Sequence, residues 1–295
     1  VGAGHDADAA GLARLLATLE DAGIRAADPR RWYGVAPVSS DRPLWGPDQQ
    51  LRVSPSKVDA VTRCPLRWAL EAAGGSGAEA LTQSLGTLIH AVAEDLPAGT
   101  RQELQARLAE RWPELGLRPG AVEMLTRRRA EAMIDRLATH VAGSGEVVGV
   151  EAEFRVDVGR AVLTGKVDRL VRVGDAVRVE DLKTGAAISN DEARRNAQLG
   201  SYQVALAEGA FGDVPSAGAA LVYVGGTTKG PTQRHQEPLE TADEPRWAHD
   251  LVTGAADLMA QASFTARTNP ACDFCPVRRS CPFQPEGRHV TQERA

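Results

Sequence analysis

The feature that most constrains this chain is a change in hydrophobic period near residue 147. Residues 147–157, 161–173 and 176–183 alternate apolar and polar side chains with a period of two, which is typical of half-buried strands. Gly159 and Gly174 separate these runs, and glycine favours tight turns. The pattern therefore predicts a three-stranded antiparallel meander.

The segments on either side of the meander have a different pattern. Apolar residues recur at helical spacing over 5–23, 80–96 and 101–141, the last with interruptions at Pro113 and at Pro119-Gly120. Ser54 followed by Pro55 is a helix start signal, and Pro65 kinks or ends that helix near Cys64. Downstream we expect a helix over 191–208, a strand over 218–226 and a helix near 244–262. These segments predict a mixed α/β (α+β) fold.

Charge and composition exclude few functions. The chain has 34 Lys and Arg against 39 Asp and Glu, a net charge of -5, which argues mildly against non-specific phosphate binding but does not exclude a nuclease. No stretch approaches the roughly 18 consecutive apolar residues of a membrane span, and no secretory leader opens the chain. We expect a cytoplasmic protein without membrane association. Because the first residue is Val1, we interpret the chain as a piece of a longer one.

Two carboxylates and a lysine lie on the predicted meander. Asp168 is in the second strand, and Asp181 and Lys183 are at the end of the third. Residues i and i+2 of a strand share a face, so Asp181 and Lys183 point the same way and Asp168 can converge with them. Carboxylates bind Mg²⁺ or Mn²⁺, and the metal polarises a phosphodiester that the lysine helps to hydrolyse. Alone, the same pattern also fits a solvated strand face with an incidental salt bridge.

Three further polar residues support the chemical interpretation. His90 lies on a predicted helix that is otherwise apolar on that side, and imidazole can supplement carboxylates as a metal ligand. A single helical histidine is also common in a core or on a surface. Gln198 and Tyr202 are spaced i, i+4 after the third strand and so share a helix face, which also fits an ordinary hydrogen-bonding surface.

The chain has four cysteines, and their spacing is clustered. Cys272, Cys275 and Cys281 form C-x₂-C-x₅-C in a proline-bearing loop near the C-terminus, and Cys64 is far upstream. In a cytoplasmic protein this layout favours ligation over disulfides. Four thiolates can bind either tetrahedral zinc or a [4Fe–4S] cluster, and the ligand count does not separate these two.

Taken together, these motifs resemble those of a known family. The order G-x-x-x-H, G-x-x-D, E-D-x-K-T-G and Q-x-x-x-Y resembles the motif series of RecB-family nucleases in the PD-(D/E)xK superfamily. The resemblance implies a restriction-endonuclease-like core, in which a central mixed sheet is flanked by helices, with an N-terminal helical region and a C-terminal cysteine-rich loop.

The same resemblance assigns roles to residues. It implies that His90, Asp168 and Asp181 are metal ligands and that Lys183 is the catalytic lysine. Gln198 and Tyr202 would position DNA near the metal. On the first strand Glu153 is a possible accessory acidic residue, whereas Glu180 alternates to the face opposite Asp181 and is left out.

The cysteine layout is similar to the iron–sulfur staple of such nucleases. By this resemblance Cys64, Cys272, Cys275 and Cys281 hold a [4Fe–4S] cluster that ties the C-terminal tail to an upstream helix. The resemblance also divides the chain into a helicase-to-nuclease extension over residues 1–50 and a nuclease domain over 51–295.

The N-terminal segment is most similar to the junction between modules in actinobacterial AdnAB-type helicase–nucleases. We therefore expect a metal-dependent nuclease acting on single-stranded DNA, with a helicase module and a hetero-oligomeric partner, that resects double-strand breaks. No G-x-x-x-x-G-K-[ST] motif is present, so this piece carries no ATPase site of that type. The alternatives are a free-standing exonuclease of the same fold, a non-catalytic DNA-end-binding iron–sulfur module, and a zinc-stapled structural domain.

Overall fold

A computed structural model describes residues 3–28, 41–75 and 81–284. The chain divides into two compact units: one contains Leu44–Arg63 and Gly77–Ala260, and the other contains Val1–Pro43, Cys64–Ser76 and Gln261–Ala295. We call the first the sheet unit and the second the cysteine unit. The boundary expected at residue 50 stays a prediction.

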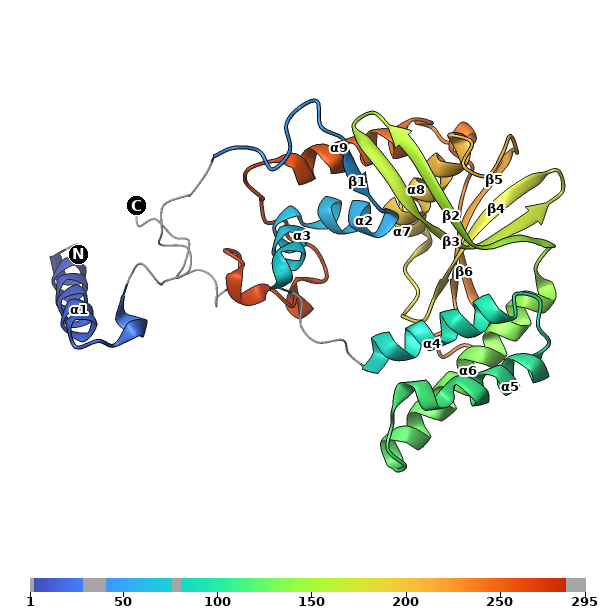
Figure 1. The fold of residues 1–295 in the computed structure, drawn as a ribbon, viewed down its shortest axis with the longest axis horizontal. Helices are drawn as coiled ribbons and strands as arrows, with labels where there is room; N and C mark the ends of the chain where they lie inside the picture. Colours follow the sequence, from blue (N-terminus) through green and yellow to red (C-terminus); the bar gives the residue numbers. More distant parts are fainter. Residues whose placement is uncertain (1–2, 29–40, 76–80, 285–295) are drawn as a thin grey trace. The chain divides into compact units, whose positions relative to one another are not determined.

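The sheet unit contains a mixed sheet of six strands (Figure 1). The strands are β1 (Leu51–Val53), β2 (Val147–Val158), β3 (Ala161–Val173), β4 (Ala176–Lys183), β5 (Ser216–Tyr223) and β6 (Thr232–Gln236). Their order is β1-β3-β4-β5-β6, and β2 pairs with β3. The pairs β2–β3 and β3–β4 are antiparallel, as the predicted meander requires, whereas β1–β3 and β4–β5 are parallel. The predicted fold class is confirmed.

Helices cover both faces of this sheet (Figure 1). The helices are α2 (Pro55–Arg63), α4 (Leu81–Asp95), α5 (Arg101–Arg111), α6 (Ala121–Gly143), α7 (Asn190–Arg194), α8 (Ala197–Ala207) and α9 (Trp247–Ala260). Helices α4, α5 and α6 form one core with Leu182 and Val222. On the other side α2, α8 and α9 pack on one another, and α8 contacts β4 and β5.

Two expected elements needed correction, and one strand was not foreseen. The helix expected over 191–208 is two helices, because Asn196 caps α8 through a hydrogen bond from the Leu199 N–H to its side chain. Strand β5 starts and ends earlier than the expected 218–226, and β6 was not expected. The break at Pro65 is confirmed, since α2 ends at Arg63 and α3 (Pro65–Leu70) begins after Cys64.

The cysteine unit consists of short elements in its described part. It contains α1 (Ala3–Asp21), α3, and two single-turn helices, Cys272–Phe274 and Arg278–Ser280. Trp68 packs against Phe264 at a ring-centroid distance of 5.6 Å, and the Leu66 N–H donates to the carbonyl of Thr265 at 3.3 Å. These contacts connect α3 to the segment that leads to the C-terminal cysteines. In the described part of the chain, no helix is both long and apolar enough to span a membrane.

Candidate active site

The candidate site forms where β2, β3 and β4 meet helices α4 and α8. His90 on α4 lies with its Nδ1 3.4 Å from Asp168 Oδ2 on β3. Gly86 precedes His90 by one helical turn, and a Cβ added there would lie 2.9 Å from Thr184 Oγ1. The G-x-x-x-H motif thus lets α4 approach the end of β4 closely enough to bring its histidine to the carboxylates.

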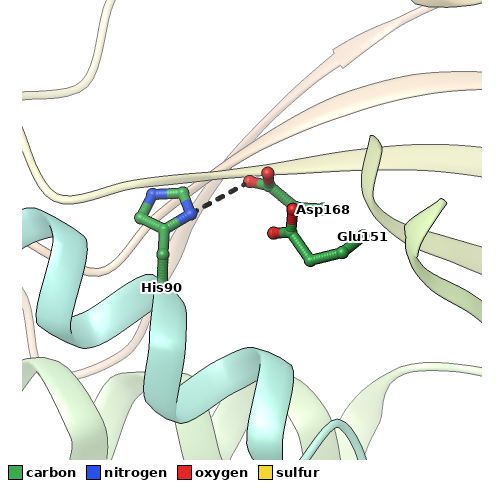
Figure 2. Close-up of side chains that lie close together, drawn as sticks. All are labelled: His90, Glu151 and Asp168. Atoms are coloured by element: carbon green, nitrogen blue, oxygen red, sulfur yellow. Dashed lines mark ion pairs between the residues drawn. The ribbon is translucent and has the colours of Figure 1, made fainter. Parts of the chain in front are cut away.

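Glu151 completes a group that sequence reasoning missed. One potential ligand atom from each of His90, Glu151 and Asp168 lies within 4.8 Å of the other two, and Figure 2 shows the three side chains converging. The φ of Glu151 is 44°, which makes it the only non-glycine residue with positive φ among those described. Such a φ is unfavourable for a residue other than glycine and is often found at functional sites.

Glu153, the accessory acidic residue named from the sequence, lies elsewhere. Its side chain is 78% exposed and forms an ion pair with Lys166 at 3.3 Å. Glu151 and Glu153 are two residues apart on the same strand, so alternation alone cannot distinguish them. The strand register distinguishes them: Val150 pairs with Arg169 and Ala152 with Val167, which puts Glu151 across from Asp168, whereas Glu153 pairs with Lys166.

Asp181 is the most tightly held carboxylate of the site. Its Oδ1 accepts hydrogen bonds from Gln198 Nε2 at 2.9 Å and from Tyr202 Oη at 3.1 Å. Its Oδ2 lies 2.6 Å from Lys183 Nζ, yet this buried oxygen accepts no hydrogen bond of good geometry from the described residues. A buried carboxylate oxygen with spare lone pairs suits a hard cation.

Gln198 and Tyr202 therefore contact the acidic site directly. Gln198 Oε1 accepts a hydrogen bond from Lys183 Nζ at 2.9 Å, and its Nε2 also donates to Tyr202 Oη at 3.0 Å. Burial and the carboxylates Asp181 and Asp168 raise the pKa of the Tyr202 phenol, which remains a hydrogen-bond donor. The two residues orient Asp181 and Lys183 in this structure, and the DNA-positioning role expected for them stays a prediction.

The protonation states of the site reflect burial and like charge. Burial lowers the pKa of His90, and Lys183 acts in the same direction, so the imidazole is neutral and keeps a lone pair for a metal. Burial and the nearby Asp181 raise the pKa of Asp168 to about 8. Asp168 Oδ2 meanwhile accepts a hydrogen bond from the Leu182 N–H at 2.7 Å, which opposes the rise.

This shift predicts a stability effect in the metal-free protein. The folded-state pKa of Asp168 lies above the ordinary value of 3.8, so its contribution to stability is fully present below about pH 4 and is lost as the pH rises through about 8. We expect Asp168→Asn to raise the melting temperature at about pH 9 by about 5 °C, with little effect at about pH 4. Thermal melts in EDTA measure this, and an equal gain at both pH values would contradict the assigned cause.

Glu180, set aside from the sequence, lies in a separate buried network. Its Oε2 is 2.8 Å from His140 Nε2 and 3.6 Å from Arg169 Nε, and its Oε1 accepts from Arg178 at 2.8 Å. Burial raises the pKa of Glu180, but the hydrogen bonds from His140 and Arg178 outweigh it and hold the pKa at about 2. Glu180 was expected on the face of β4 opposite Asp181, and these contacts agree, because Glu180 contacts His140 on α6 whereas Asp181 contacts α8.

The four cysteines line one pocket within the cysteine unit, together with Leu66, Arg67 and Val277. All four are free thiols. The Asn269 N–H donates to Cys272 Sγ at 3.3 Å. Burial lowers the pKa of Arg67, but its hydrogen bond and ion pair with Glu71 raise it, with smaller contributions from Cys275 and Cys64. Four convergent sulfurs, an N–H donor and a cation fit a negatively charged metal–thiolate centre.

Comparison with known proteins identifies the family. Residues 52–282 match the sequence model of the PD-(D/E)XK nuclease superfamily. The chain belongs to this superfamily. Membership indicates a metal-dependent nuclease, and the donor group of His90, Glu151 and Asp168 fits the divalent metal that such nucleases use. Asp181 lies outside this group of three, so the ligand role expected for it stays a prediction.

Individual relatives add little beyond the superfamily. The Gene 69 protein of Mycobacterium phage D29 is 27% identical over 138 residues, which cover 45% of this chain and 47% of the relative. The chain thus matches about half the length of that protein. The crystal structure of SSO0001 covers 81% of this PD-(D/E)XK chain and 90% of its own, with 14% identity and a TM-score of 0.36.

Proposed function

We propose that this PD-(D/E)XK protein is a RecB-type deoxyribonuclease that hydrolyses phosphodiester bonds of single-stranded DNA with Mg²⁺ or Mn²⁺. The observation that carries the proposal is the convergence of His90, Glu151 and Asp168. Asp181 and its ion pair with Lys183 lie beside them on the neighbouring strand. The Oδ2 of Asp181 is buried without a hydrogen bond from the described residues, which leaves it available to a cation.

The residues of the site have separable roles in this proposal. His90, Glu151, Asp168 and Asp181 would hold the divalent cation, which when bound polarises the scissile phosphate. Lys183 Nζ, held by Gln198 Oε1 at 2.9 Å, stabilises the negative charge that develops as water adds to phosphorus and one P–O ester bond breaks. Gln198 and Tyr202 keep the Asp181 carboxylate and the lysine in place.

The wider context is also a proposal. The resemblance of the N-terminal segment to a helicase–nuclease junction favours a cytoplasmic helicase–nuclease that resects double-strand breaks, with a helicase module in the same or a longer chain and a hetero-oligomeric partner. Cys64, Cys272, Cys275 and Cys281 would hold a [4Fe–4S] cluster, supported by their convergence on one pocket. The second candidate, a free-standing exonuclease of the same fold, is favoured if the chain cleaves DNA without any motor.

The experiment that tests the activity uses metal removal. We expect the protein to cleave end-labelled single-stranded DNA in Mn²⁺ or Mg²⁺ and to lose cleavage in EDTA, with recovery when the metal is restored. A 5′-labelled and a 3′-labelled strand, compared on gels, report where cleavage begins. Cleavage that persists in EDTA would contradict the assigned site, and DNA binding without cleavage in any metal would favour the non-catalytic end-binding alternative.

A further inference from the structure

A shallow groove crosses the exposed surface of β1, β2 and β3. It is lined by Arg52 from β1, by Glu153 and Arg155 from β2, and by Thr164 and Lys166 from β3. The register places Arg155 opposite Thr164 and Glu153 opposite Lys166, and Arg52 beside Val162. Directly paired residues share a face, as do residues two apart on a strand. The side chains that line the groove therefore form one continuous strip, which we call the β-face groove.

Cations dominate the β-face groove. Arg52 and Arg155 are exposed, and their side chains form no hydrogen bond or ion pair with any other described residue. Lys166 is paired with Glu153 at 3.3 Å, but their side chains are 52% and 78% exposed, and such a surface pair contributes little free energy. Three cations against one carboxylate leave an excess of positive charge in a protein whose net charge is -5, which suits a polyanion.

The β-face groove begins next to the candidate metal centre. Lys166 precedes Asp168 by two residues on β3, and Glu153 follows Glu151 by two residues on β2. A strand rises about 3.3 Å per residue, so the groove starts roughly 7 Å along the strands from these carboxylates. A nucleic-acid strand that reaches the metal centre thus has cations beside it on the same two strands.

We propose that the β-face groove binds the sugar–phosphate backbone of the substrate strand, with Arg52 and Arg155 contacting phosphates. Glu153 opposes this binding, both by repelling phosphate and by pairing with Lys166. The inference rests on the proposed nuclease function and adds the position of the strand. Since phosphate contacts read no base, binding in the groove is indifferent to sequence.

The test measures binding separately from cleavage. Anisotropy of a fluorescent single-stranded oligonucleotide is titrated in EDTA at salt from about 50 to about 200 mM. For the pair Arg52→Ala/Arg155→Ala we expect binding about tenfold weaker and a salt slope smaller by about 1.4, as for two lost phosphate contacts. The control pair Arg128→Ala/Arg129→Ala removes the same charge from exposed positions of α6 and should bind within about twofold of wild type.

A third variant gives an effect of opposite sign, which misfolding cannot produce. Glu153→Gln should bind DNA about threefold more tightly, because it removes the opposing charge and releases Lys166. Equal weakening by the two arginine pairs, or unchanged binding by Glu153→Gln, would overturn the groove proposal. If wild type cleaves DNA while the groove variants bind DNA as tightly as wild type, the groove proposal is contradicted and the proposed nuclease function is not. If wild type neither binds nor cleaves, the proposed function fails with it.

Discussion

Replacing Asp181 by alanine should lower the cleavage rate at least about a thousandfold, since metal coordination contributes several kcal/mol to catalysis. The substitution removes the acceptor of the hydrogen bonds from Gln198 and Tyr202 and the partner of Lys183 Nζ. Gln198, Tyr202 and Lys183 therefore all lose the carboxylate that they contact. Asp181→Asn keeps an oxygen acceptor but removes the charge, so it should be nearly as inactive. Single-turnover cleavage of labelled single-stranded DNA measures both.

The matched control is another aspartate of the same hairpin. Asp175 lies in the exposed turn between β3 and β4, and Asp175→Ala should cleave at the wild-type rate. Thermal melts establish that each variant folds. Residual cleavage by Asp181→Ala within about tenfold of wild type would contradict the assignment of the metal centre.

Replacing Cys275 by alanine should abolish the brown colour expected of an iron–sulfur protein and strongly destabilise the cysteine unit. Cys275 lines the same pocket as the other three cysteines, and ligation of a structural centre is coupled to folding. We expect a loss of at least several kcal/mol in stability, because structural metal sites contribute on that scale. Visible absorbance, iron content and thermal melts are the measurements.

Phe274 provides the control next to this cysteine. Its ring is 88% exposed, so Phe274→Ala should keep the colour, the iron content and the melting profile. If the wild-type protein is colourless and contains stoichiometric zinc, the four cysteines bind zinc and not an iron–sulfur cluster. If Cys275→Ala loses cleavage but keeps the wild-type melting profile, the cysteines do not stabilise the fold.

The sequence predicted the meander well because each strand has one buried face. Residues 147–157, 161–173 and 176–183 were expected as strands. The observed β3 and β4 have these bounds, and β2 is one residue longer. Their period of two follows from that one-sided burial. The same periodicity placed Asp181 beside Lys183, which the 2.6 Å contact confirms.

What the sequence did not reveal depends on tertiary context. Glu151 lies beside Asp168 because of the register of β2 on β3, which the sequence of either strand alone does not encode, so Glu153 was named in its place. Strand β6 has a largely polar sequence, TQRHQ, and gives no strand signal of its own, because its pairing with β5 supplies the order. The division between α7 and α8 depends on a single capping side chain, Asn196, within a stretch whose apolar spacing continues on both sides.

The adjacent carboxylates Glu180 and Asp181 also favour the native register of β4 over a slipped one. Glu180 meets His140 and Arg178 in a buried ion network, while Asp181 accepts from Gln198 and Tyr202 on α8. A one-residue slip of a strand moves every side chain to the opposite face. The mispaired strand would leave His140 and Arg169 without their carboxylate and would turn Lys183 toward the apolar core of α4–α6. Each of these errors would bury an unpaired charge away from water. The register that assembles the site is therefore also the register that favours folding.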